Sequence, residues 1–221
     1  MDDQALVPNG YREASSEGLT TANMRVLQYG LQRSGSTFIY QVLADYFPEG
    51  GVIRTHNYLV LPASVPVIVS FRDFRDCVVS HWRLENPERK EMTTEEVFFF
   101  AGIYRRAIWC MEQYLHRRNP VLILRYEDWH IDPVRYLCEP LEAIFSLGHK
   151  EDRRQAILQR HSLEENRRLS WGETPPPPET NLMVRHVHEG EPGSWKRFLS
   201  SENALLLTDL LADYLRKHHY L

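Results

Sequence analysis

Residues 25–37 have the sequence RVLQYGLQRSGST, a short apolar run that leads through a glycine-containing turn into a polar segment. The run Arg25–Tyr29 is typical of a strand, and the residues after the turn predict a helix over Ser36–Phe47. A strand, a glycine-containing turn and a helix in this order form the setting of a phosphate-binding loop, because N–H groups of the turn and of the helix start point toward a bound anion. The segment therefore predicts an anion site on an α/β fold.

The turn spans Gly30–Thr37 and matches the phosphate-loop pattern GxxxxGK[ST] except at one position, since Ser36 stands where the lysine is expected. An NTPase uses that lysine together with Mg²⁺ to neutralise the β- and γ-phosphates. The basic group of this turn is Arg33, which favours a different, diphosphate-like ligand. A plain strand-to-helix turn that is capped by Ser34 is the alternative interpretation of the same residues.

Further apolar runs predict the rest of the sheet. Strands are expected at Val52–Thr55, Val67–Phe71 and Val121–Arg125, and longer helical patterns separate them. Continuous apolar strands between helices are typical of a parallel sheet that is covered on both faces. The sequence thus predicts an α/β three-layer sandwich with a central parallel sheet, arranged as in P-loop NTPases.

Helical patterns follow each predicted strand and continue to the end of the chain. Helices are predicted at Arg75–Trp82, Thr94–His116, Pro133–Ser146, Lys150–Gln159 and Asn203–Lys217, and Thr93-Thr94-Glu95-Glu96 is a capping signal. The prolines Pro175–Pro178 predict an extended surface link, because proline does not fit a helix interior. Residues 1–23 are polar and lack a clear period, which predicts a loosely held tail before a single domain over residues 24–221.

The composition disfavours several classes of protein. With 26 Lys and Arg against 30 Asp and Glu, the net charge of −4 gives no basic field for nucleic acid or an anionic membrane, and 43% hydrophobic residues are typical of a globular chain. The three cysteines form no disulfide or zinc pattern, which favours a reducing compartment. Since the sequence has no secretory signal and no apolar stretch of about 20 residues, we expect a cytoplasmic protein without nucleic-acid or membrane partners.

A second candidate anion site follows the strand predicted at Val67–Phe71. Arg72 lies at the carboxyl end of that strand, where ligands bind in open α/β sheets, and Ser80 lies two turns into the next helix. An arginine fork with a nearby hydroxyl suits a phosphate monoester. The alternative is a surface ion pair of Arg72 with Asp76 or Asp73, as is common among solvated charges.

Five segments, in this order along the chain, resemble the PAPS-dependent sulfotransferases, for which PAPS denotes 3′-phosphoadenylyl sulfate. The resemblance covers roughly Met24 to Ser200. The matching segments are Gln32–Phe38 for the 5′-phosphosulfate loop, Arg54-Thr55-His56 for the Lys-Thr-His motif, Val69–Ser80 for the 3′-phosphate segment with Arg72 and Ser80 as its arginine and serine, Pro120–Asp128 for a later strand that ends in Tyr-Glu-Asp, and Pro192–Lys196 for the Gly-x-Trp-Lys end of a C-terminal nucleotide loop.

The resemblance implies transfer of a sulfuryl group from PAPS to a hydroxyl or amine of an acceptor, without a metal. It assigns two catalytic roles: Arg33 stabilises charge on the leaving phosphate, and His56 takes the acceptor proton, since imidazole is neutral and basic near pH 7. It also implies that Phe38 stacks on adenine. The residues expected to bind the donor are Arg33, Ser34, Gly35, Ser36, Thr37, Phe38, Arg72, Ser80, Tyr126, Ser162, Arg185 and Lys196.

The sequence also departs from the family. Arg33 replaces the lysine of the cytosolic enzymes, as in the protein-tyrosine branch, and His188–Glu191 is an insertion in the C-terminal loop. Either Arg185 or Lys196 is therefore the candidate for the 3′-phosphate. No segment like the family's dimer segment follows Trp195, and neither the acceptor nor the oligomeric state is predicted. Two alternatives remain open: a P-loop kinase or NTPase that binds ATP with Mg²⁺, and a nucleotide-binding module without catalysis.

Overall fold

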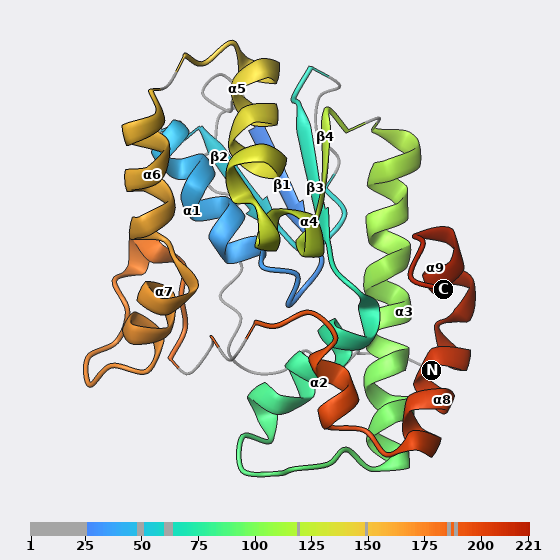
Figure 1. The fold of residues 1–221 in the computed structure, drawn as a ribbon. Helices are drawn as coiled ribbons and strands as arrows, with labels where there is room; N and C mark the ends of the chain where they lie inside the picture. Colours follow the sequence, from blue (N-terminus) through green and yellow to red (C-terminus); the bar gives the residue numbers. More distant parts are fainter. Residues whose placement is uncertain are drawn as a thin grey trace, which may run out of the picture.

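The structure is a computed structural model, and it describes residues 26–47, 51–59, 64–118, 120–148, 150–184, 187 and 190–221. A parallel sheet lies between two layers of helices (Figure 1). The predicted tail at residues 1–23 and the first residues of the predicted domain, Met24 and Arg25, lie outside the described residues.

The sheet consists of β1 (Val26–Gly30), β2 (Val52–Thr55), β3 (Val67–Phe71) and β4 (Leu122–Arg125), in the order β2-β1-β3-β4. All neighbouring strands are parallel. The two central strands, β1 and β3, are buried at every residue, which explains why their sequences are mostly apolar rather than alternating. Their two buried polar side chains pair, since the Gln28 amide donates to the Ser70 hydroxyl at 3.2 Å. The predicted strands are confirmed to within a residue, since β1 ends at Gly30 and β4 begins at Leu122.

Each central strand directs side chains to both faces of the sheet. Val26 and Ile68 pack in one apolar cluster with α1 (Ser36–Tyr46), α4 (Tyr126–Ile131), α5 (Glu139–Phe145) and α6 (Glu151–Arg160). Leu27, Val67 and Val69 pack in a second cluster with α2 (Phe74–Glu85), α3 (Thr94–Arg117), α8 (Ser201–Leu210) and α9 (Ala212–Lys217). The predicted three-layer α/β sandwich is therefore confirmed. No helix in the described ranges is long and apolar enough to cross a membrane.

Two segments that were predicted as single helices are each divided. The segment Pro133–Ser146 contains a π-helix, η2 (Val134–Cys138), ahead of α5. Pro140 lacks the N–H that would bond the carbonyl four residues earlier, which favours the wider π turn. The segment Asn203–Lys217 forms α8 and α9, which meet at the buried Leu211. The Thr208 hydroxyl donates to the Ala204 carbonyl at 2.7 Å, a contact that bends a helix end.

The proline run is not entirely extended, because Pro178 begins a 3₁₀ turn, η3 (Pro178–Thr180). Proline is tolerated in the first turn of a helix, where no N–H is needed. Three further elements were not predicted: α4, α7 (Leu163–Ser170) and the 3₁₀ turn η4 (Ser194–Arg197).

The predicted capping signal of α3 is confirmed. Thr93 accepts a hydrogen bond from the N–H of Glu96, and the Glu96 carboxylate accepts one from the N–H of Thr93 at 2.8 Å. Reciprocal bonds of this kind satisfy two N–H groups that a helix start otherwise leaves unpaired.

Thr93→Ala should lower the melting temperature by about 2–4 °C, because loss of such a cap costs about 1 kcal/mol in a protein of this size. Thr93→Ser keeps the hydroxyl and should retain the melting temperature of the wild type. Thermal unfolding followed by circular dichroism measures both variants. Equal melting temperatures for Ala and Ser would show that the cap does not stabilise α3.

Candidate functional site

A cavity of about 350 Å³ lies where the carboxyl ends of the strands meet the start of α1. Its walls come from the turn after β1, the ends of β2 and β3, α2, α4, and segments around η3 and Gly190. The lining residues are Gln32, Arg33, Gly35, Ser36, Thr37, Arg54, His56, Arg72, Ser80, Tyr126, Leu163, Pro178, Asn181, Leu182, Met183, Val187 and Gly190. The sheet topology thus brings together three separate sequence motifs.

The two glycines of the turn are needed for its shape. Gly35 has φ +75°, and a Cβ at this position would lie 2.6 Å from the Trp129 ring. A Cβ at Gly30 would lie 2.2 Å from the Cβ of Ser36. These contacts explain why the pattern GxxxxGK[ST] requires glycine at both positions, since only glycine allows the backbone to approach so closely.

Gly35 is the N-cap residue of α1, and within the described part of the chain no side-chain cap hydrogen bond forms there. The alternative role of Ser34 as the cap is therefore wrong: its hydroxyl donates to the Leu31 carbonyl at 2.6 Å, and the residue is fully buried. The first N–H groups of a helix have no acceptor within the helix and carry partial positive charge. Gly35, Ser36 and Thr37 line the cavity, so the start of α1 provides donors for an anion there.

Two arginines lie at the turn, one within it and one at the end of β2. Arg33, with φ 65°, donates from Nε to the hydroxyl of Ser80 at 3.1 Å. Arg54, at the end of β2, donates from Nη1 to the hydroxyl of Thr37 at 2.7 Å. The structure therefore places both arginines beside the start of α1.

His56 follows β2 and lines the same cavity. Its Nδ1 lies 2.5 Å from the carbonyl oxygen of Gly30, and because a carbonyl accepts only, Nδ1 carries the proton and Nε2 is the unprotonated nitrogen of the neutral ring. Burial lowers the pKa of His56 to about 4, and the neighbouring charges of Arg54 and Arg33 contribute in the same direction. His56 is therefore a neutral imidazole at physiological pH.

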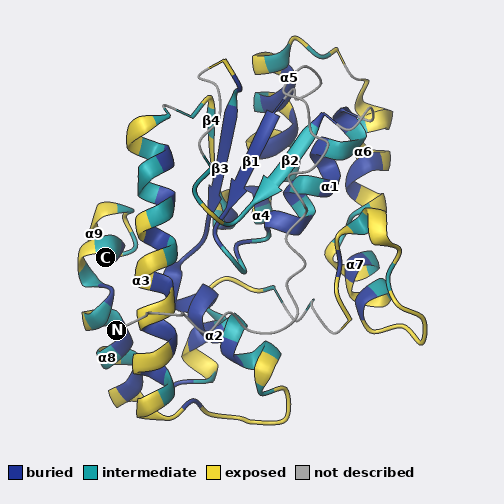
Figure 2. Ribbon diagram, turned by 180° about the vertical axis from the view of Figure 1, so that it is seen from behind, coloured by how far each residue is buried: buried dark blue, intermediate teal, exposed yellow. Residues whose placement is uncertain are grey.

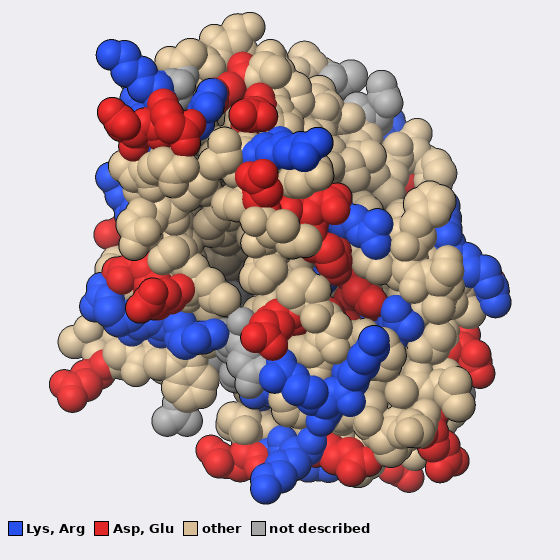
Figure 3. Space-filling model, viewed as in Figure 1, with Lys and Arg blue, Asp and Glu red and all other residues tan. Residues whose placement is uncertain are grey.

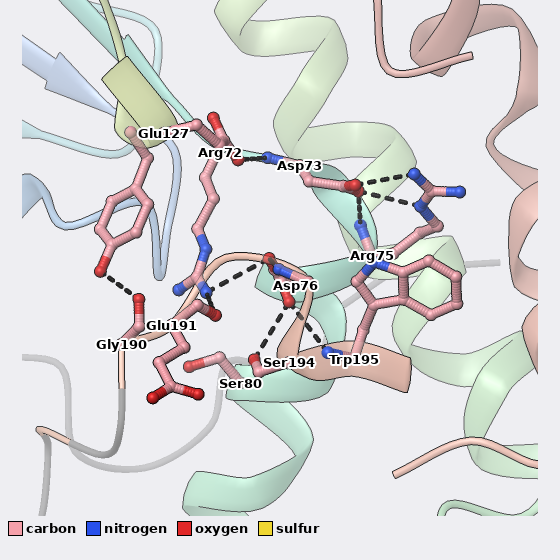
Figure 4. A network of polar contacts seen from close by, with 12 residues as sticks. Arg72, Asp73, Arg75, Asp76, Ser80, Glu127, Gly190, Glu191, Ser194 and Trp195 are labelled. Carbon is pink, nitrogen blue, oxygen red and sulfur yellow. Dashed lines mark hydrogen bonds and ion pairs between the residues drawn. The ribbon is translucent and has the colours of Figure 1, made fainter. Parts of the chain in front are cut away.

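Arg72 forms an ion pair with Asp76, with 3.2 Å between Nη2 and Oδ2 (Figure 4). Asp76 is one of the two partners that the surface ion-pair interpretation names for Arg72. The pair is not at the surface, however, because the side chains of Arg72 and Asp76 are only 4% and 0% exposed. The guanidinium also lies 4.3 Å from the centre of the Tyr126 ring and donates to the Glu191 carbonyl at 2.6 Å. Its Nε is buried without an acceptor among the described residues, which leaves a donor for a ligand.

Asp76 also holds the loop that precedes η4. Its carboxylate accepts hydrogen bonds from the N–H of Gly193 at 2.7 Å, the hydroxyl of Ser194 at 3.1 Å and the N–H of Trp195 at 2.9 Å. Figure 4 shows these contacts beside Arg72. One buried carboxylate thus fixes both an arginine of the cavity and the loop that resembles a nucleotide loop.

Tyr126 lines the cavity, and its hydroxyl donates to the Gly190 carbonyl. Burial raises the pKa of Tyr126 to about 12, while the charge of Arg72 opposes this shift. The phenol consequently stays protonated at physiological pH. Together with the bond from Arg72 to Glu191, this contact secures the segment that closes one side of the cavity.

Several expected ligands do not line the cavity. Phe38 stacks on Trp129, with ring centres 4.9 Å apart, and Ser162 caps α7 by accepting the N–H of Glu165 at 3.2 Å. Lys196 is exposed beside the Trp195 ring. The side chain of Ser34 points to the carbonyls of Leu31 and Ser70. Arg185 lies outside the described residues.

The cavity is basic although the chain is acidic overall. Three arginines line it, and none of its described lining residues is Asp, Glu or Lys. On the face shown in Figure 3, acidic and basic side chains are interspersed, with basic ones gathered around α2 in the lower part. Of these three arginines, Arg54 was not predicted from the sequence as a binding residue. Its position at a strand end, two residues before His56, is the signal that predicts it.

Among the described residues, no group of three or more His, Cys, Asp and Glu side chains is arranged to hold a metal ion. No protein-family model matches the sequence, and a search of curated protein sequences gives no match. Among solved structures, the fold is similar to mouse sulfotransferase SULT7A1 complexed with PAP, with a TM-score of 0.65. The match covers 88% of this chain and 85% of that chain at 17% sequence identity. The likeness shows a sulfotransferase-like fold.

Proposed function

We propose that the protein transfers a sulfuryl group from PAPS to a hydroxyl or amine of an acceptor. The observation that carries this proposal is the cavity with three arginines and no described acidic lining residue at the start of an uncapped helix. Such a site favours a ligand with more than one anionic group. The similarity to a structure complexed with PAP supports the same class of ligand.

The residues present fit this donor. The buried Nε of Arg72, which has no acceptor among the residues that the structure describes, and the hydroxyl of Ser80 suit a phosphate monoester. The start of α1 and Arg33 suit a second phosphate, because Arg33, Gly35, Ser36 and Thr37 all line the cavity and helix-start N–H groups favour an anion. When bound, PAPS supplies an activated sulfuryl group on its 5′-phosphate.

His56 is proposed to accept the proton of the acceptor. The bond between Nδ1 and the Gly30 carbonyl leaves Nε2 unprotonated, so Nε2 takes the proton as the acceptor oxygen or nitrogen attacks sulfur. The new bond to sulfur forms as the bond between sulfur and the 5′-phosphate oxygen breaks. His56 releases the proton to solvent after the transfer.

Arg33 is proposed to stabilise the charge that develops on the leaving phosphate. It lies at the centre of the turn and reaches Ser80 through Nε. Donors that are already in place stabilise a developing anion without reorganisation during the reaction. Arg54, held by Thr37, adds a second positive charge near the same position.

Conversion of PAPS tests the proposal. The wild type is incubated with PAPS and a panel of phenols, aliphatic alcohols, amines, sugars and tyrosine peptides, and formation of the 3′,5′-bisphosphate is followed by chromatography. We expect acceptor-dependent product with at least one class. If PAPS binds but is recovered unchanged with every acceptor, the protein is a nucleotide-binding module without catalysis. If ATP is consumed with Mg²⁺ instead, it is a kinase or NTPase.

The rate should stay nearly constant with pH down to about 5, because a base with a pKa near 4 remains unprotonated over this range. An ordinary histidine, with a pKa of about 6.5, would lose activity below neutrality. In Arg54→Gln, removal of a neighbouring positive charge should raise the pKa of His56, so the acid limb should move to higher pH. The pH profile of kcat/KM measures both. An acid limb near pH 6.5 in the kcat/KM profile of the wild type would contradict the buried position of His56 beside Arg54 and Arg33.

A further inference from the structure

Helix α3 has an apolar face that no described residue covers. One side of the helix is buried in the core, with residues such as Phe100, Tyr104 and Ile108. The opposite side exposes four large apolar side chains: Phe98 (53%), Phe99 (62%), Ile103 (36%) and Trp109 (53%). Figure 2 shows exposed segments along α3 from behind. Apolar side chains that gather on one helix face mark an interaction surface more often than a solvated one.

Gly102 lies in the middle of these four residues, inside a helix of 24 residues. Glycine in a helix interior is less favourable than alanine. A Cβ at Gly102 would meet nothing within 4 Å, and its φ is not in the left-handed region, so the single chain does not require glycine here. A glycine at this position is explained if another backbone approaches closely.

We propose that the α3 face, defined by Phe98, Phe99, Gly102, Ile103 and Trp109, pairs with the α3 face of a second copy of this chain. The two helices run antiparallel and cross at Gly102. This arrangement buries the exposed aromatic side chains of both copies around a close backbone contact. A two-fold pair of this kind uses the same surface on both subunits, so a self-complementary face is required.

The charges along α3 are self-complementary in the antiparallel direction. With 1.5 Å per residue, Phe98 and Arg106 lie equally far, about 6 Å, on opposite sides of Gly102. Phe98 therefore meets Arg106 of the partner subunit, a favourable contact between a guanidinium and an aromatic ring. Glu95 is exposed on the same face, one turn beyond Phe98, and also comes within reach of Arg106 of the partner subunit. A parallel pair would instead bring the like-charged Arg106 side chains together.

The proposal does not depend on the proposed function. No residue of α3 lines the cavity, so pairing through the α3 face leaves the cavity lining uncovered. The buried side of the same helix contacts the turn between β1 and α1, since the Tyr104 hydroxyl donates to the Gln32 carbonyl at 3.3 Å.

Sedimentation velocity of the full chain over a hundredfold range of concentration tests the pairing. The wild type should change from the mass of one 26.1 kDa chain to the mass of two. Gly102→Gln adds bulk at the crossing while favouring the helix, and Phe99→Asp adds charge to the apolar face. Both variants should raise the dissociation constant at least tenfold. Ile131→Asp, at an 80% exposed position on α4, is the control and should pair like the wild type.

The melting temperature separates loss of pairing from loss of folding. At concentrations where the wild type is a single chain, Gly102→Gln should melt no lower than the wild type, because glutamine is the better helix former. A wild type that stays a single chain at every concentration would overturn the proposal. In that case another part of the chain or a different partner covers the α3 face. Pairing that survives both variants would overturn it too.

Discussion

Asp76→Ala should lower the melting temperature by about 6–20 °C and abolish tight binding of adenosine 3′,5′-bisphosphate. The variant leaves Arg72 as a buried charge without its partner, and such a loss costs about 3–5 kcal/mol, or about 2–4 °C per kcal/mol in a chain of this length. It also removes the acceptor for the N–H groups of Gly193 and Trp195. The loop before η4 and the arginine at the end of β3 therefore lose their positions together.

Calorimetric unfolding and titration at low temperature, where the variant is still folded, measure the two effects separately. Asp76→Asn keeps one carbonyl acceptor but not the charge, so it should retain part of the loop contacts and lose the ion pair with Arg72. Glu191→Ala is the matched control, because it removes an exposed carboxylate from the same loop and leaves the backbone carbonyl that Arg72 contacts. Equal melting temperatures for Asp76→Ala and Glu191→Ala would contradict the role assigned to Asp76.

His56→Ala should reduce kcat by about 10²–10⁴-fold while the affinity for the bisphosphate changes little, since a positioned general base contributes about that factor to the chemical step and not to donor binding. His56→Gln retains a side-chain N–H that can donate to the Gly30 carbonyl but has no basic nitrogen. It should therefore fold like the wild type and be as slow as the alanine variant.

Single-turnover kinetics with saturating PAPS measure the chemical step. His116→Ala, which removes an exposed histidine on α3, is the control and should retain the wild-type rate. If His56→Gln reacts at the rate of the wild type, His56 does not take the acceptor proton, and its hydrogen bond to Gly30 serves the fold alone.

The sheet could be predicted from the sequence because its central strands are short and mostly apolar. The turn between β1 and α1 could be predicted because only glycine fits at two of its positions. Gly30 and Gly35 lack space for a Cβ, and Gly35 also has a positive φ. Helix α4 was missed since it follows β4 directly at Tyr126 and has no side-chain cap. Helix α7 carries a recognisable signal, Ser162 followed by Glu165, although resemblance assigned that serine to the donor.

The contacts between distant segments were harder to predict from the sequence. The ion pair of Arg72 with Asp76 is consistent with their spacing of four residues, since Arg72 lies just before α2 and Asp76 lies in its first turn. Its burial, however, depends on the loop at Gly193–Trp195, more than a hundred residues away. The position of Phe38 against Trp129 depends likewise on the packing of α4 on α1. Spacing along the chain predicts neighbours within an element, whereas burial is decided by which elements pack together.

We propose that the cavity binds a nucleotide with separated 3′- and 5′-phosphates. Titration calorimetry with adenosine 3′,5′-bisphosphate and with ADP, with and without Mg²⁺, tests it most directly, because these ligands differ chiefly in the position of one phosphate. We expect tight, Mg²⁺-independent binding of the bisphosphate and weak binding of ADP. Ser80→Ala, which keeps the buried pair of Arg72 and Asp76 intact, should weaken binding of the bisphosphate at least tenfold. Equal binding of the two nucleotides, or preference for ADP in the presence of Mg²⁺, would show that the cavity has no 3′-phosphate site.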